Sequence, residues 1–172
     1  GISAGDGAIA DGIGSYLICA HGIAPNGGGS YVNNWTLLLD VKFPASSAGY
    51  WMSLYQTNSS NGNDGDCFIS TSRTIGVGAT GYTSRIVQAQ VWYWIVISVS
   101  NTNFYRIYVD GSKWLEGTVQ SLDGRFSLDP TILLFADENG EDYPIHCTTA
   151  AVWGQALSDA QVSSLGNAYN PI

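Results

Sequence analysis

Two short acidic loops hold the densest groups of side chains that could do chemistry. They span residues 61–66 and 137–142, and each joins acids and amides on a glycine-containing turn. A hard cation such as calcium needs about six to eight oxygen ligands, which carboxylate and amide groups supply. The loops therefore predict one bound calcium ion, with solvated turns of an acidic protein as the alternative. The candidate ligands are Asp64, Asp66, Asp137, Glu138, Asn139 and Asp142.

Aromatic side chains are also abundant, with six Trp and ten Tyr. Flat rings stack against the apolar faces of sugar rings, but rings also fill cores and protein interfaces. Those expected in the core are Trp35, Tyr93, Tyr105 and Trp153. Those expected on the surface, as ligand-binding residues, are Trp51, Trp94, Trp114, Tyr82 and Tyr108.

Catalytic patterns are missing from the sequence. A glycosidase needs two carboxylates that flank the scissile bond, yet the three glutamates, Glu116, Glu138 and Glu141, fall in or beside turns. His21 and His146 lie near apolar runs without a nucleophile motif, so we interpret them as ordinary strand histidines. We expect no catalytic residue, and we keep a glycan-processing enzyme as an alternative.

Charge and hydropathy exclude other classes of function. The 172 residues carry a net charge of −8, which argues against binding to nucleic acid or to anionic membranes. The chain has no run of 18 uncharged apolar residues, so we expect no membrane insertion. Three cysteines (Cys19, Cys67 and Cys147) permit at most one disulfide within the chain. We expect a soluble protein from which any export signal has been removed.

The elements that must position these residues read as strands. Apolar runs separated by turn residues predict a single all-β domain over residues 1–172. The expected strands are residues 15–21, 35–43, 50–56, 67–70, 92–100, 104–109, 131–135 and 144–153.

Three local signals are sharper. Asp110-Gly111 predicts a tight hairpin turn between two apolar-rich runs. Ser158 and Gln161 form a capping box, and Gly166 ends the one short helix, over 158–165, which packs through Leu157, Val162 and Leu165. Period-2 alternation directs residues 93, 95, 97 and 99 and residues 105, 107 and 109 inward, and it predicts a shared aromatic outer surface over both strands.

These signals resemble a known family. The segment Ala151-Val152-Trp153-Gly154-Gln155-Ala156-Leu157-Ser158 resembles the closing motif of laminin-G-like jelly rolls in the concanavalin A-like superfamily, and Tyr108-Val109-Asp110-Gly111 resembles their hairpin. The resemblance extends over roughly residues 34–165. It implies a two-sheet antiparallel jelly-roll β-sandwich with one C-terminal helix.

The resemblance also bears on the calcium ligands. The acidic loops are similar to the calcium arrangement of pentraxins, another group of these jelly rolls. By that likeness Asp64 is the first acidic ligand, Asp66 a neighbouring acid, and residues 137–139 a trio that precedes the closing motif. Glu141 and Asp142 stand closer to the trio than the matching pentraxin acid does, so the likeness implies one ion rather than two.

Other stretches resemble secreted bacterial accessory modules, among them Asp64-Gly65-Asp66-Cys67 and Asp123-Gly124-Arg125-Phe126. The sequence thus predicts a non-catalytic, calcium-binding, lectin-like module at the bacterial cell surface or outside the cell. Its expected partner is an extracellular polysaccharide, held by Trp94 or Trp51 with the loops of Asp64 and Asp137, alongside other domains of a larger parent protein. The main alternative is an adhesion or assembly domain that binds protein.

Overall fold

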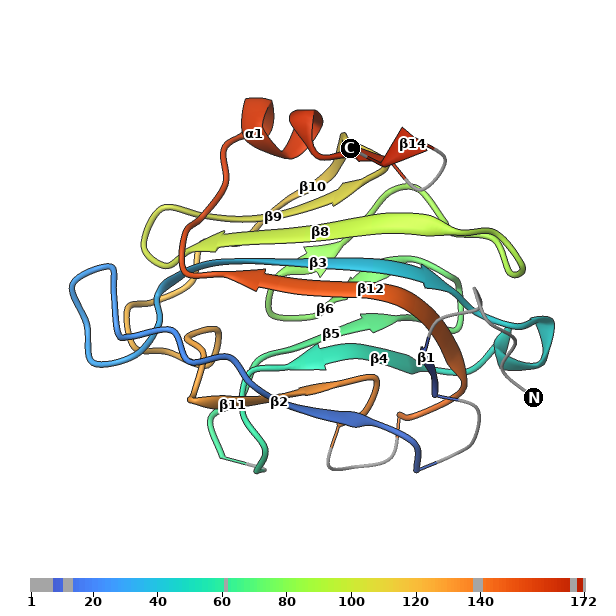
Figure 1. Cartoon of the computed structure of the whole chain (residues 1–172), viewed down its shortest axis with the longest axis horizontal. Helices are drawn as coiled ribbons and strands as arrows, with labels where there is room; N and C mark the ends of the chain where they lie inside the picture. The colour runs from blue at the N-terminus through green and yellow to red at the C-terminus, as the bar shows by residue number, and fades with distance from the viewer. Residues whose placement is uncertain (1–7, 11–13, 61, 138–140, 168–169, 172) are drawn as a thin grey trace.

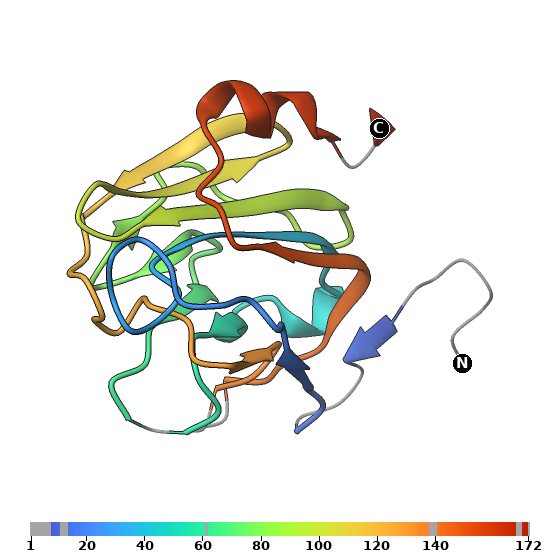
Figure 2. The same cartoon turned by 60° about the vertical axis from the view of Figure 1, so that its left-hand side comes forward.

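The computed structural model describes residues 8–10, 14–60, 62–137, 141–167 and 170–171, and it is a β-sandwich (Figure 1). Two six-stranded antiparallel sheets stack face to face, as the view of Figure 2 makes clear. The predicted fold class is confirmed. No helix among the described residues is long and apolar enough to cross a membrane.

The first sheet has the order β1-β12-β3-β8-β9-β10. Its strands are β1 (Ala8–Ala10), β3 (Asn34–Lys42), β8 (Tyr93–Ser100), β9 (Phe104–Val109), β10 (Ser112–Gly117) and β12 (Ile145–Trp153).

The second sheet has the order β2-β11-β4-β5-β6-β7. Its strands are β2 (Leu17–Ala20), β4 (Met52–Gln56), β5 (Asp66–Ile69), β6 (Ile75–Val77), β7 (Gly81–Tyr82) and β11 (Thr131–Leu134). The remaining elements are the 3-10 helix η1 (Ala45–Ser47), helix α1 (Asp159–Ser164) and the small pair β13 (Gly166–Asn167) and β14 (Asn170–Pro171).

The main core follows the predicted alternation. Ile95, Ile97 and Val99 of β8 are fully buried between the sheets. They pair with inward residues of β3 on one side and of β9 on the other. Asp110 and Gly111 both have positive φ angles, so the predicted hairpin turn between β9 and β10 is confirmed.

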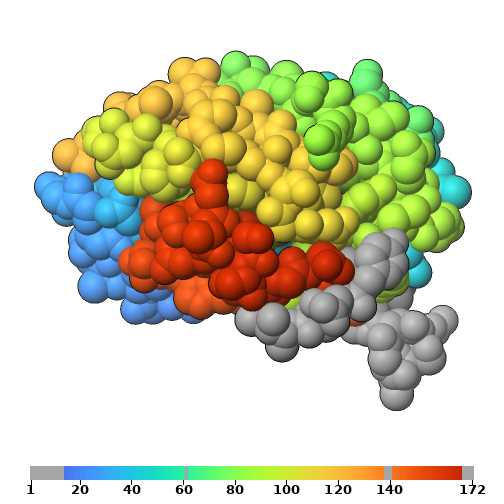
Figure 3. Space-filling view, turned by 90° about the horizontal axis from the view of Figure 1, so that it is seen from above, coloured from blue at the N-terminus to red at the C-terminus, as the bar shows by residue number. Residues whose placement is uncertain are grey.

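The opposite face of β8 and β9 was predicted to form an exposed aromatic surface, and the structure differs. Trp94 and Tyr108 are only 9% and 1% exposed, because α1 covers them through Val162. In Figure 3 the C-terminal segment, in red, lies against the yellow strands of this sheet. The predicted aromatic outer surface is therefore wrong: the alternation separates the two faces of a strand but does not reveal what covers each face.

Helix α1 itself matches its prediction. Ser158 is the N-cap, its capping box with Gln161 is complete, and Gly166 leaves the helix with a φ of +83°. Polar contacts then fix the helix to the sheet, because Asp159 accepts a hydrogen bond from the Tyr108 hydroxyl at 2.7 Å and pairs with Arg106 and Lys113. Both the apolar contact of Val162 and these polar contacts therefore hold the helix against this face.

A buried pair of phenols links the two sheets. The Tyr55 hydroxyl of β4 lies 2.8 Å from the Tyr105 hydroxyl of β9, and neither side chain is exposed. Burial raises the pKa of both phenols well above the usual range, so both stay protonated. Burial also raises the pKa of the neighbouring Cys67 thiol to about 12.

We predict that Tyr105→Phe lowers the free energy of unfolding by about 1–3 kcal/mol, because the buried Tyr55 hydroxyl loses its partner. Urea denaturation measures the change. In the double variant Tyr55→Phe/Tyr105→Phe no phenol is orphaned, so its loss should be smaller than the sum of the two single losses. Additive losses would contradict the assigned bond.

Candidate functional site

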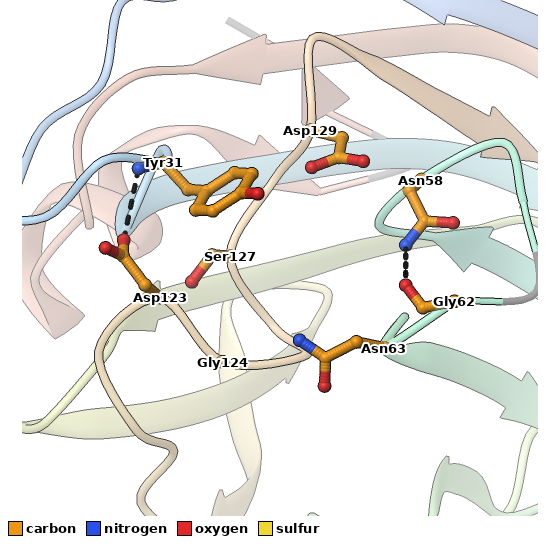
Figure 4. Close-up of a pocket in the computed structure, with 8 residues that line it drawn as sticks. All are labelled: Tyr31, Asn58, Gly62, Asn63, Asp123, Gly124, Ser127 and Asp129. Atoms are coloured by element: carbon orange, nitrogen blue, oxygen red, sulfur yellow. Dashed lines mark hydrogen bonds between the residues drawn. The ribbon is translucent and has the colours of Figure 1, made fainter.

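A polar pocket of about 100 Å³ opens at one end of the sandwich, where three loops meet (Figure 4). The loops precede β3, join β4 to β5 and precede β11. Tyr31 and Asp129, which lie 98 positions apart in the sequence, therefore line the same pocket. The lining residues are Tyr31, Asn58, Gly62, Asn63, Asp123, Gly124, Ser127 and Asp129.

The Asp123 carboxylate clamps the first loop. It accepts hydrogen bonds from the backbone N–H groups of Ser30, at 3.0 and 2.8 Å, and Tyr31, at 3.1 Å, and from the Asn33 side chain at 2.8 Å. A Cβ at Gly29 would lie 2.2 Å from the Asp123 carboxylate, so only glycine permits this approach. These bonds hold the pKa of Asp123 below the usual range, with the Asn33 amide as the largest cause and the Ser30 N–H next.

Asn33 joins the loop before β3 to Asn101 and to the loop before β11. Its fully buried side-chain oxygen accepts from the Asp123 N–H, the Asn101 amide and the Ser127 hydroxyl, at 2.8, 3.0 and 2.8 Å. Its nitrogen donates to Asp123 and to the carbonyls of Asn26 and Tyr31. So many hydrogen bonds on one buried side chain favour a single arrangement of the segments that it joins.

The loop between β4 and β5 is held by a close backbone approach. The Thr57 hydroxyl donates to the Arg125 carbonyl and accepts from the Gly65 N–H. A Cβ at Gly65 would lie 2.6 Å from the Phe126 ring, which makes glycine necessary there. Asn63 adopts a φ of +55°, which asparagine tolerates, and its amide borders the pocket.

The open side of the pocket combines one ring with two polar groups. Tyr31 is 44% exposed, and its phenol, the Asp129 carboxylate and the Asn63 amide border the same space in Figure 4. Asp129 offers acceptors, Asn63 offers a donor and an acceptor, and Tyr31 offers an aromatic face. The arrangement can therefore bind a small ligand that carries several hydroxyl groups and an apolar face.

The five predicted ligand-binding aromatics do not form one site. Trp94 and Tyr108 are buried beneath α1, so their prediction as surface rings is wrong. Trp114 is half-buried against the main core, and Arg85 lies over its ring. Trp51 and Tyr82 are exposed by 36% and 40%, and their ring centroids lie 6.5 Å apart on the second sheet.

The described calcium candidates are also dispersed. Asp66 pairs with Gln56 and Asp142 with Met52, which places the two acids four residues apart along β4, roughly 13 Å at the rise of a strand. Asp137 accepts from the Glu141 N–H. Glu138 and Asn139 lie outside the described residues. Among the residues described, no three His, Cys, Asp or Glu side chains form a group that could hold a metal ion.

Sequence reasoning found the loop beside Asp64 but missed the groups that face the pocket. Asn63 belongs to the predicted acidic loop, and Asp123 begins an Asp-Gly turn. Tyr31 and Asp129 carry no comparable local signal. The three cysteines, predicted to form at most one disulfide, are free thiols.

Comparisons with known proteins identify only the fold. No family model matches the chain, and no curated protein does so. Among solved structures, Trypanosoma rangeli sialidase matches at a TM-score of 0.70 with 14% identity, over 93% of this chain and 27% of the sialidase chain. The binding domain of botulinum neurotoxin serotype D matches at 0.62 with 15% identity, over 91% of this chain and 41% of the other.

A third similar structure is the receptor binding domain of botulinum neurotoxin mosaic serotype C/D, with a TM-score of 0.57 and 16% identity, over 77% and 36% of the two chains. The chain thus spans less than half the length of each of these structures. At such identities the likeness shows a shared β-sandwich architecture.

The Asp123 clamp predicts a pH dependence. The pKa of Asp123 is lower in the folded chain than in the unfolded chain, where it is about 3.9. The clamp therefore stabilises the fold fully at a pH above the unfolded-state pKa, and this stabilisation is lost as the pH falls through the folded-state pKa. The melting temperature of Asp123→Asn should therefore lie below that of the wild type at about pH 5–7, and the gap should be smaller at about pH 3. Asp129→Asn, which keeps the clamp, is the matched control. A gap that is the same at both pH values would contradict the clamp.

Proposed function

We propose that this chain is a non-catalytic, extracellular module that binds a glycan in the polar pocket. The observation that carries the proposal is the convergence of the exposed Tyr31 ring with Asp129 and Asn63 at one rigid opening. Sugars present hydroxyl groups that need acceptors and donors, and ring faces that favour aromatic contact. The pocket provides both within about 100 Å³.

The clamp also explains why we propose binding without catalysis. Asp123 and Asp129 line one pocket, and a pair of carboxylates could suggest glycoside hydrolysis. A general acid needs a raised pKa, however, whereas hydrogen bonds lower the pKa of Asp123. Its oxygens are already engaged by the loop, so Asp123 acts as a support for the site.

Charge favours a neutral glycan. The chain carries a net charge of −8, and both acids in the pocket add to the local negative potential. One of the similar structures is the sialidase in complex with sialic acid, and another is the receptor binding domain of a botulinum neurotoxin. These are properties of those proteins, and the sugar bound by the sialidase supports a glycan as the ligand proposed here.

A second candidate function, adhesion through protein contact, is favoured by strand β2. This strand lies at the edge of the second sheet, and Leu17 and Ile18 are 44% and 63% exposed. An exposed apolar edge strand can pair with another chain. Binding of a protein at this edge would leave the polar pocket free.

A glycan array is the first test, and we expect hits among neutral glycans. For a hit, Tyr31→Ala and Asn63→Ala should each weaken binding by about tenfold or more in calorimetry, which corresponds to about 1.4 kcal/mol. Trp51→Ala, which removes an exposed ring on the second sheet, is the matched control and should leave the affinity unchanged.

Two outcomes would contradict the proposal. Silence on both neutral and acidic glycans, with and without calcium, would favour the adhesion function. Loss of binding in Trp51→Ala but not in Tyr31→Ala would move the site to the exposed rings of Trp51 and Tyr82.

Calcium binding stays a prediction from the sequence, and we propose one ion held by the loops of Asp64 and Asp137. A ligand that binds only the folded state stabilises it, by about 2.7 kcal/mol at a hundredfold excess over its dissociation constant. The melting temperature should therefore rise in millimolar calcium relative to chelator, and Asp137→Ala should abolish the rise. Equal melting temperatures in both conditions would rule out the ion.

A further inference from the structure

A second pocket adjoins the polar pocket and shares Tyr31 with it. Its volume is about 130 Å³, and its lining is mainly apolar. We call it the apolar pocket. The lining residues are His21, Ile23, Pro25, Ser30, Tyr31, Val32, Leu128 and Pro130.

One stretch of backbone separates the two pockets. Along residues 127–130, Ser127 and Asp129 line the polar pocket, whereas Leu128 and Pro130 line the apolar pocket. This is the alternation of an extended chain, which Val32 holds in place by an antiparallel bridge to Leu128. The dividing wall is therefore one strand thick, and Tyr31 forms its rim.

The polar groups of the apolar pocket are largely engaged already. The Nδ1 atom of His21 accepts from the Ile23 N–H at 3.0 Å, so Nε2 carries the proton and donates to the Asp129 carbonyl at 2.6 Å. The backbone N–H of Ser30 is bound to Asp123. The pocket therefore suits the part of a ligand that makes few hydrogen bonds.

We infer that the glycan carries a methyl-ended substituent, an acetamido group or a 6-deoxy carbon, which enters the apolar pocket while the sugar hydroxyls occupy the polar pocket. This inference rests on the proposed function and narrows its ligand class. A buried methyl group gains free energy by leaving water, and an apolar pocket discriminates one such group by about tenfold or more. A sugar with a bare hydroxyl at the same position has to bury that hydroxyl without a partner.

Matched sugars test the inference. Chitotriose (three N-acetylglucosamine units) and cellotriose differ only in the acetamido group, and L-fucose and L-galactose differ only in the 6-hydroxyl. We expect about tenfold tighter binding of the methyl-bearing member in one pair, measured by NMR titration. The pair that shows the preference identifies the substituent.

Variants of Ile23 locate the preference. Ile23→Phe narrows the apolar pocket and should remove the preference, because it weakens binding of chitotriose or L-fucose more than binding of cellotriose or L-galactose. Ile23→Ala widens the pocket and should reduce the preference severalfold. This second variant provides the test if the larger Phe side chain impairs folding. A melting temperature for each variant establishes that it is folded.

The outcomes separate this inference from the proposed function. Two results would overturn the inference and leave glycan binding intact. The first is a set of array hits that depend on Tyr31 but lack any methyl-ended substituent. The second is equal affinity within both sugar pairs when all four sugars bind. A preference that survives Ile23→Phe would also overturn it. No glycan binding at all would overturn both.

Discussion

The buried amide of Asn33 is the interaction on which the candidate site depends. It lies just before β3. Its side chain bonds to the loop of Asn26 and Tyr31, to Asn101 after β8, and to Asp123 and Ser127 before β11. An amide has both donors and an acceptor, so one buried side chain can satisfy partners of both kinds. An apolar residue there would orphan several buried groups at once.

Two glycines let the loops around the pocket approach closely. Gly29 brings the first loop against the Asp123 carboxylate, and Gly65 brings the loop after β4 against Phe126. The two loops then enclose the pocket from opposite sides. Binding to such a preorganised opening requires little ordering of the protein, which favours affinity. The sandwich supplies the rigid frame, and the loops supply the chemistry.

Local signals were enough to predict most of the fold. The Asp110-Gly111 turn, the Ser158 cap and the alternation of β8 each depend on neighbours in sequence, and the structure has all three. The short strands β6 and β7 were missed because Gly76 and Gly81 dilute their strand signal. Trp94 was misplaced because its cover, Val162, comes 68 residues later.

The site was less accessible to sequence reasoning for a similar reason. Asn33 bonds to Ser127 across 94 residues, and no pattern within either segment indicates the other. The acidic loop at Asp64 was noticed for its charge, yet the residue that borders the pocket is its neutral neighbour Asn63. The composition of the chain led to the prediction of a glycan ligand. The residues proposed to bind that ligand follow from tertiary contacts.

The most direct test of this account is a two-dimensional ¹H–¹⁵N NMR titration of the labelled chain with a glycan selected on the array. The account predicts that the largest shifts occur at the backbone amides of Tyr31, Asn63 and Asp129, with little change at Trp51 and Tyr82. Shifts confined to Trp51, Tyr82 and their neighbours on the second sheet, with the three pocket amides unmoved, would contradict it.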